Sequence, residues 1–182
     1  MAPLIKEFFH MAKDRDEIKA KASRLGFEYE RDNRGCAQCC FAALQEALNL
    51  RNPGTDAIFR AASTMAGGVA GEADGHCGAY SGGVLMLGYL FGREREAFFD
   101  PDKKRYKARN YAAEFHKKFI DEYGSVTCEH IHRKLFGRTY YLRDEDDKAK
   151  YMAEGAYVDK CTNVVGKAAG WVVDILADAG EL

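Results

Sequence analysis

Residues 77–91 read CGAYSGGVLMLGYLF and contain the longest apolar run of the chain. A helix over this stretch has no polar face, so we expect it to be buried. Its first half carries Gly78, Ala79, Gly82 and Gly83, and each glycine lowers helix propensity by about 1 kcal/mol relative to alanine. Close packing of neighbouring backbones, or contact of a cofactor with the backbone at Gly78, Ala79 and Gly82, would compensate for that cost. The stretch therefore predicts a buried, Gly-rich central helix.

Helical periodicity continues on both sides of the central helix. Apolar residues recur at helical spacing among charged ones, and no stretch alternates as a strand does. Gly26 and Gly124 mark expected helix ends, and Gly155 marks a point at which the last helix can divide. We expect the other helices over residues 4–25, 36–48, 56–65, 102–123, 125–136 and 149–179, with residues 138–150 as a polar connection.

These elements predict an all-α fold, with residues 1–182 forming a single helical domain. We expect a bundle or array of six or seven helices around the Gly-rich central helix. Residues 1–29 are its N-terminal amphipathic helix, and residues 30–178 are the region that carries every cysteine. With 47% hydrophobic and 30% charged residues, a chain of 182 residues can build one sizeable core.

Charge and hydropathy exclude several classes of function. The net charge of −1 leaves no surplus of Lys and Arg for binding nucleic acid. The longest apolar run is shorter than the ~20 residues that cross a bilayer. The first residues carry charges ahead of any apolar segment, which is unlike a secretory signal. We therefore expect a cytoplasmic protein with no nucleic-acid partner and no membrane insertion.

Six cysteines are the main chemical feature of the chain. Disulfides are rare in the cytoplasm, so the sequence favours chemistry at free thiols. Cys36, Cys77 and Cys128 each follow residues that commonly cap helices, which places them in first helical turns. The partial positive charge of a helix start lowers the pKa of a thiol, and Lys160 can act in the same way on Cys161. The sequence thus predicts thiolates at these four positions.

The order of the cysteines resembles that of a known family. The chain reads GCAQ at residues 35–38, then a Gly-rich loop, then CGAYSG at residues 77–82, then Cys128 and Cys161. This order is similar to that of the redox-active proteins named for a C-GCAxxG-C-C pattern, over residues 35–176. The resemblance implies a redox role, catalytic or metal-ligating, for one cysteine of each segment.

A similar cysteine set occurs in split-Soret-type cytochromes, where it has been suggested to hold an iron–sulfur cluster. Those proteins carry haem, whose usual attachment sequence is C-x-x-C-H. Here Cys36-Ala37-Gln38-Cys39 is followed by Cys40 instead of histidine, so we do not expect covalent haem. Cys39 and Cys40 also lie outside the family pattern, and we regard them as auxiliary.

Three functions remain open. In the first, Cys36, Cys77, Cys128 and Cys161 bind an iron–sulfur cluster, or zinc, and the protein is an oxidoreductase or electron carrier. In the second, two thiols cycle between dithiol and disulfide, with Cys36 and Cys39 as one neighbouring pair. In the third, the chain is a helical module without redox chemistry, and its cysteines belong to the core. The first function is favoured.

Two histidines are weaker candidates for metal ligands. His132 lies four residues after Cys128, on the same face of a predicted helix, and His76 directly precedes Cys77. A protein that carries electrons needs a second protein that supplies or accepts them, so a redox partner protein is expected. The chain is also compatible with a homodimer.

Overall fold

The computed structural model describes the backbone of residues 2–182 and the side chains from residue 14 onward. Within residues 2–182 the chain is all-helical, as predicted, and has no strand beyond one isolated antiparallel bridge between His76 and Thr127. The apolar face predicted at the start of the first helix lies outside the described side chains. The α-helices are α1 (Ala2–Asp32), α2 (Cys36–Ala47), α3 (Pro53–Ala61), α4 (Gly78–Phe91), α5 (Lys104–Tyr123), α6 (Cys128–Phe136), α7 (Glu145–Ala153) and α8 (Cys161–Asp178). A 3₁₀ turn, η1 (Ala62–Met65), extends α3, and a π-helical turn, η2 (Ala156–Lys160), precedes α8.

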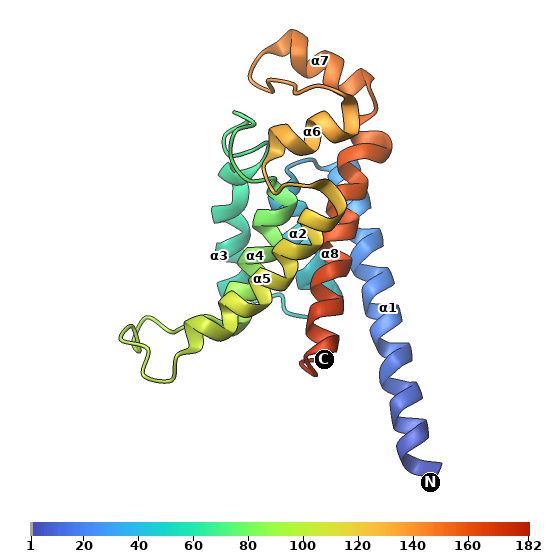
Figure 1. The fold of residues 1–182 in the computed structure, drawn as a ribbon, viewed down its shortest axis with the longest axis vertical. Helices are drawn as coiled ribbons and strands as arrows, with labels where there is room; N and C mark the ends of the chain where they lie inside the picture. Colours follow the sequence, from blue (N-terminus) through green and yellow to red (C-terminus); the bar gives the residue numbers. More distant parts are fainter. Residues whose placement is uncertain (1) are drawn as a thin grey trace.

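The long helices form one array, and α6 and α7 lie across one end of it (Figure 1). Helix α1 packs along α8, while α2 packs against both α1 and α4. The core between them is filled by large buried side chains, including Phe41, Met86, Phe115, Phe119 and Ile175. Helices α2, α4 and α8 all begin at the end that carries α6, so their N-terminal residues lie near one another.

Helix α1 is longer than the sequence predicts. The expected end at Gly26 is wrong, because α1 continues to Asp32. A Cβ atom at residue 26 would lie 3.0 Å from the Val165 carbonyl oxygen, and one at Gly166 would lie 2.8 Å from the Ser23 carbonyl oxygen. Both glycines therefore allow close packing of α1 on α8. The glycine that resembles a helix end is instead part of a helix contact.

Helix α4 contacts α2 through two glycines, which have no side chains. A Cβ atom at Gly82 would lie 2.5 Å from the Ala37 carbonyl oxygen and 2.8 Å from the Cys40 Cβ atom. A Cβ atom at Gly78 would overlap the Cys36 sulfur. Glycine at both positions lets the two helices approach closely, which compensates for the lower helix propensity. The Gly-rich helix packs against α2, α5 and α8 through one buried face, but Gly88 and Tyr89 are exposed. The prediction of a buried helix therefore holds for that face and is wrong for its last turns.

The region before α8 differs from the predicted polar connection. Residues 138–150 contain the start of α7, which raises the number of α-helices within the described chain to eight. The Asp144 side chain caps this helix by accepting a hydrogen bond from the Asp147 N–H at 2.8 Å. Gly155, with φ 83°, then interrupts the predicted helix over residues 149–179, so that α7 and α8 are separate. The division at Gly155 is confirmed.

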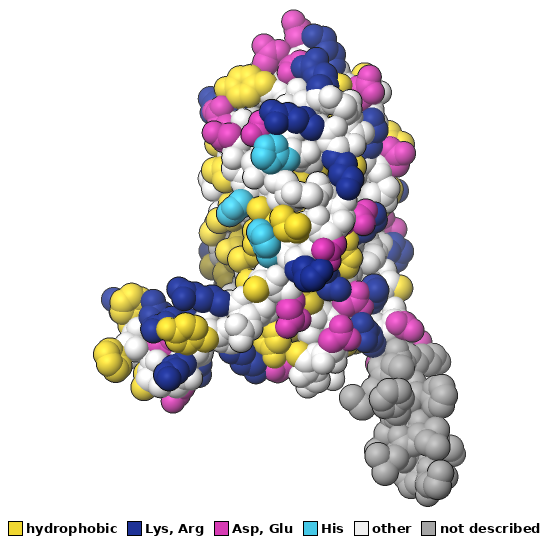
Figure 2. Space-filling view, in the orientation of Figure 1, with side chains coloured by type: hydrophobic (Ala, Val, Ile, Leu, Met, Phe, Trp, Pro, Cys, Tyr) yellow, Lys and Arg dark blue, Asp and Glu magenta, His cyan; other side chains and the backbone are white. Residues whose placement is uncertain are grey.

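Residues 92–103 and the start of α5 project from the array at the end away from α6 (Figure 1). Hydrophobic and basic side chains lie together on this projection (Figure 2). Phe98 and Phe99 are exposed there, and the Arg93 guanidinium lies 4.4 Å from the centre of the Phe98 ring. Within residues 2–182, none of the helices combines the length and the apolarity needed to span a bilayer.

Candidate functional site

Cys36, Cys77, Cys128 and Cys161 line one cavity of about 250 Å³, called here the thiol cavity. Three of them are the first residues of α2, α6 and α8, and Cys77 is the N-cap residue of α4. These helices begin at the same end of the array, so four side chains from distant parts of the sequence reach a common space. All six cysteines of the chain are free thiols.

The isolated bridge ahead of α4 and α6 holds two of these cysteines beside each other. The Cys77 N–H donates to the Val126 carbonyl oxygen at 2.8 Å. In return, the Cys128 N–H donates to the Gly75 carbonyl oxygen at 2.9 Å. This short ladder joins the segment before α4 to the segment before α6. It therefore determines where both helices begin and where both thiols lie.

A left-handed loop forms one wall of the thiol cavity. Residues 67–71 all have positive φ values, between 55° and 78°. Val69 and Ala70 are among them, although residues with a Cβ atom rarely adopt this conformation. Gly68 has no room for a side chain, because a Cβ atom there would lie 2.6 Å from the Ala73 Cα atom. Such strained backbone is often found beside functional sites.

Backbone N–H groups act on two of the four sulfurs. The Gly67 N–H, from the left-handed loop, lowers the pKa of Cys36. The N–H groups of Ala79 and Tyr80, in the first turn of α4, have the same effect on Cys77. N–H groups of a first helical turn have no partner within their own helix, so they are free to stabilise a thiolate.

Side chains supply the hydrogen-bond donors for the other two sulfurs. The Tyr151 hydroxyl donates to Cys161 Sγ at 3.0 Å. His132 Nε2 lies 3.6 Å from Cys128 Sγ, and His132 Nδ1 accepts from the Tyr140 N–H at 3.5 Å. Because Nδ1 is an acceptor, the ring proton is on Nε2 and points toward the sulfur. Burial lowers the pKa of His132 to about 4, so the ring is neutral at neutral pH.

Burial outweighs these donors. The N–H groups at the start of α4 do lower the pKa of Cys77, as expected, but loss of water has the larger effect and raises that pKa to about 11, so the prediction of a thiolate at Cys77 is wrong. Burial is also the main cause of the raised pKa values of Cys36, Cys128 and Cys161, and negative charge on Glu30 and Cys77 raises all three further. These four thiols can ionise together only when positive charge enters the cavity.

One acidic side chain of the cavity was missed by the sequence analysis. Glu30, in the last turn of α1, lines the thiol cavity and is only 3% exposed. Burial raises its pKa to about 7. The sequence predicts a connection for its segment, because Gly26 has the pattern of a helix end. Tyr151 was also missed, and no motif in the sequence marks either residue.

The small residues of α4 lie behind the cavity. Gly78 and Gly82 pack against α2, Ala79 is buried, and none of the three lines the thiol cavity. Gly78 acts through packing, because its missing side chain leaves room for the Cys36 sulfur. Contact between these residues and a cofactor stays a prediction. His76 is exposed and does not line the cavity either.

Cys39 and Cys40 are packing residues in this structure. The Cys39 thiol donates to the Arg34 carbonyl oxygen at 3.1 Å, and Cys40 is fully buried beside Gly82. Burial raises the pKa of both thiols. Neither side chain lines the thiol cavity, which separates them from the four cysteines of the resemblance.

The spacing of the thiols limits the kind of metal site that they can form. Among the side chains from residue 14 onward, no three His, Cys, Asp or Glu groups lie close enough together to hold one metal ion. A Cys₄ zinc site needs four sulfurs about 2.3 Å from a single point. An iron–sulfur cluster instead distributes four thiolates over several iron atoms. The donor set and the volume of the cavity therefore fit a cluster better than a single ion.

Comparison with known protein families matches most of the chain. The profile of a family described as "Putative redox-active protein (C_GCAxxG_C_C)" matches residues 35–175. The matched span contains all four cysteines of the thiol cavity and ends short of Glu30 on its N-terminal side. No curated protein and no solved structure matches the chain.

Proposed function

The chain belongs to the C_GCAxxG_C_C family of redox-active proteins, and from that premise we propose that it is an electron carrier with an iron–sulfur cluster. The ligands of the cluster are Cys36, Cys77, Cys128 and Cys161. One observation carries the proposal: these four side chains converge on a single cavity, and an N–H or O–H donor acts on each sulfur.

A cluster supplies the positive charge that the thiol cavity lacks. Burial raises the pKa of all four thiols, so a thiolate in the cavity is unfavourable by itself. Iron ions bind thiolates and displace their protons to the solvent, which offsets that cost. The donors around the sulfurs then stabilise the negative charge that remains on the ligands.

Thiol–disulfide exchange has less support. It needs a thiol that ionises near neutral pH, and the thiols of the cavity have raised pKa values instead. Cys39, the neighbour predicted for Cys36, does not line the cavity, and its S–H group donates to a backbone carbonyl. A single zinc ion is disfavoured by the spacing of the thiols.

The surroundings of the cavity suit one-electron transfer. Burial and hydrogen bonds to the ligand sulfurs set the reduction potential of a cluster, and Tyr151 and His132 supply two of these bonds. Cys36 and Cys161 are more exposed than Cys77 and Cys128, which favours electron transfer at their side of the cavity. A reduced partner protein would pass one electron to the cluster here, and an oxidised partner would remove it, with no covalent bond formed or broken.

The test is purification of the full chain without oxygen. We expect a coloured protein that contains iron and acid-labile sulfide and whose visible absorption bleaches with dithionite. A colourless protein without metal, whose count of free thiols rises by two on reduction, would overturn the proposal and favour thiol–disulfide exchange. Six unreactive thiols without metal would overturn it in favour of a structural module.

The matched control for this test is a cysteine outside the cavity. Cys39→Ala removes a buried thiol of α2 that bonds to Glu30 but does not line the thiol cavity. All four cysteines of the cavity are kept, so the colour and the iron content should stay unchanged. Equal loss of iron in Cys39→Ala and Cys36→Ala would show that the cavity is not the binding site.

A further inference from the structure

The Glu30 carboxylate is the least satisfied polar group of the thiol cavity. Its side chain is 3% exposed, and its Oε2 atom has no hydrogen-bond partner in the described structure. An ionised carboxylate is strongly disfavoured in such surroundings unless a cation or a hydrogen-bond donor meets it. Glu30 lines the same space as the four cysteines, so a cation in the cavity is within reach of this side chain.

The nearest basic side chain does not satisfy Glu30. The charge of Arg34 lowers the pKa of Glu30, but this effect is smaller than those of burial and of the Cys39 thiol. The Arg34 guanidinium lies over the Tyr157 ring, 4.8 Å from its centre. Thus the side chain that could form an ion pair with Glu30 is engaged with an aromatic ring, and Oε2 stays without a partner.

Glu30 also adds negative charge to a space that already concentrates it. Its carboxylate raises the pKa of all six cysteines, including the four that line the cavity. Four thiolates and a carboxylate around one cavity repel one another. A cation bound at their centre attracts each of these groups and thereby offsets the repulsion between them.

We propose that Glu30 is a fifth protein ligand in the thiol cavity and binds one iron of the cluster through its carboxylate oxygen. This inference rests on the proposed function, since it requires iron in the cavity. The carboxyl group releases its proton to the solvent as the oxygen–iron bond forms, so charge and atoms balance. One iron then differs from the others, because it has an oxygen ligand in addition to sulfur.

The test compares the iron atoms of the reconstituted protein by Mössbauer spectroscopy. For wild type we expect a separate doublet of higher isomer shift for a fraction of the iron. In Glu30→Gln that doublet should merge with the others, and release of iron to a chelator should be about 10-fold faster. The control is Glu28→Gln, two residues away on α1, where the carboxylate pairs with Arg24 and does not line the cavity.

The outcomes separate this inference from the proposed function. A wild-type cluster whose iron atoms all have sulfur ligands only would overturn the role of Glu30 and leave the cluster standing. A wild-type protein that takes up no iron would overturn the proposed function itself. If Glu30→Gln does not fold or holds no cluster, the wild-type spectrum alone decides, because it reports the ligand atoms directly.

Discussion

Two cavities of similar size lie beside α2, and they differ in how their polar groups are used. The thiol cavity has a volume of about 250 Å³, and the second, called here the α3 cavity, has about 320 Å³. Each is lined by at least one cysteine of α2, Cys36 in the first and Cys39 in the second. Size and the presence of a thiol therefore do not distinguish them.

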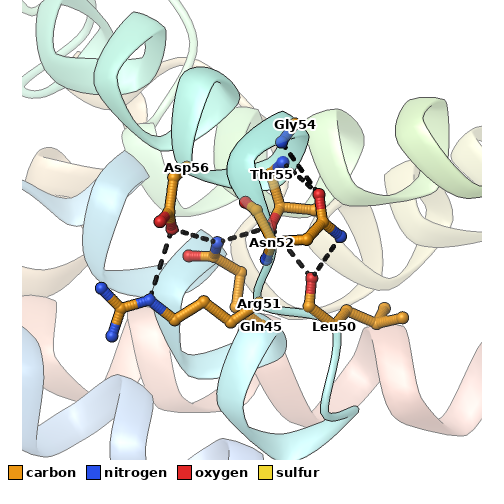
Figure 3. Close-up of polar contacts among 7 residues, drawn as sticks. All are labelled: Gln45, Leu50, Arg51, Asn52, Gly54, Thr55 and Asp56. Carbon is orange, nitrogen blue, oxygen red and sulfur yellow. Dashed lines mark hydrogen bonds and ion pairs between the residues drawn. The ribbon is translucent and has the colours of Figure 1, made fainter.

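Three polar side chains of the α3 cavity lining, Gln45, Arg51 and Asp56, contact one another or the start of α3 (Figure 3). Gln45 Nε2 donates to Thr55 Oγ1 at 2.9 Å and to Asp56 Oδ1 at 3.2 Å. Arg51 Nε lies 3.5 Å from the same Asp56 oxygen. Asn52 caps α3 by accepting from the Thr55 N–H at 3.1 Å, and its own N–H donates to Thr55 Oγ1. These contacts stabilise the start of α3.

In the thiol cavity, by contrast, the polar groups are not all satisfied by one another. Its sulfurs have hydrogen-bond donors, no Lys or Arg among the described side chains lines it, and Glu30 Oε2 has no hydrogen-bond partner there. The comparison shows that unsatisfied, convergent ligands identify a binding site better than volume does. The larger cavity serves the fold, and the smaller one is the candidate for chemistry.

The largest difference between the two cavities should appear in the iron content after one thiol is removed from each. Cys77→Ala removes the sulfur whose charge acts on Cys36, Cys128 and Cys161, so the bound iron should fall to background. Cys39→Ala should keep the full amount. Iron and sulfide analysis after anaerobic reconstitution measures the content of both variants. A Cys77→Ala protein that retains its cluster would show that the thiol cavity is not the binding site.

The pH dependence of stability in the apoprotein tests the unsatisfied carboxyl group. Burial raises the pKa of Glu30 from 4.5 to about 7, so between these values the folded chain holds a proton that the unfolded chain has lost. Stability therefore falls as pH rises from 4.5 to above 7, by roughly 3 kcal/mol. His132, with its lowered pKa, acts in the opposite direction below pH 6.5.

Urea unfolding of the apoprotein at pH 5 and pH 8 checks this prediction. Glu30→Gln should lose the fall in stability, while the contribution of His132 stays the same in both proteins. Equal pH profiles for wild type and Glu30→Gln would show that Glu30 is not held in its buried position. The α3 cavity has no comparable group, because its Asp56 carboxylate has partners.

The contact between Gly78 and Cys36 links the fold to the thiol cavity. In Gly78→Ala the new Cβ atom meets the Cys36 sulfur and lies 2.8 Å from the Ala37 nitrogen. We expect a loss of about 1–3 kcal/mol in unfolding free energy and weaker cluster binding. Gly88→Ala is the control on the same helix, since a Cβ atom there meets nothing within 4 Å. Gly88→Ala should gain up to about 1 kcal/mol in unfolding free energy. Equal changes in unfolding free energy in the two variants would exclude a packing role for Gly78.

Thr55→Val removes a buried hydroxyl that bonds to Gln45, a residue of the α3 cavity lining, while keeping the shape of the side chain. The buried Gln45 amide loses an acceptor and the Asn52 N–H loses another, which should cost about 1–2 kcal/mol of stability. Thermal unfolding measures this loss. The iron content should not change, and a loss of iron in folded Thr55→Val would show that the two cavities are coupled.

The smallest effect is expected for Tyr151→Phe, which removes one O–H···S bond and little else. A donor at a ligand sulfur favours the reduced cluster, which carries more negative charge, so its removal should lower the reduction potential. One hydrogen bond of about 1 kcal/mol corresponds to roughly 40 mV for one electron. Redox titration by visible absorption measures the shift, and an unchanged or higher potential would contradict the assigned donor.

Most of the helices were predictable from periodicity, and the exceptions have local causes. Gly26 has the usual signature of a helix end, but packing on α8 keeps the chain helical beyond it. The helix after Asp144 is only nine residues long and mostly polar, so its periodicity is weak and its cap is the main signal. Both errors arose where tertiary contacts or a single cap outweigh the local pattern.

The four cysteines of the candidate site could be named from their order and from their place before helices. The sign of their pKa shift could not, because a helix start lowers the pKa while burial raises it, and only the packed structure shows which effect is larger. Glu30 and Tyr151 could not be predicted from the sequence, for another reason. Each is ordinary in the sequence and acquires its role from the elements packed around it.

The sequence by itself determined an all-helical chain, a Gly-rich helix inside it and four cysteines at or beside helix starts. Those properties depend on side-chain pattern and on local backbone preference, which neighbouring residues specify. The tertiary structure decided that the four thiols share one cavity, that their ionisation needs a cation, and that a carboxylate from α1 faces the same space. Burial and charge are properties of the whole assembled surface around an atom, so they exist only once the helices have packed.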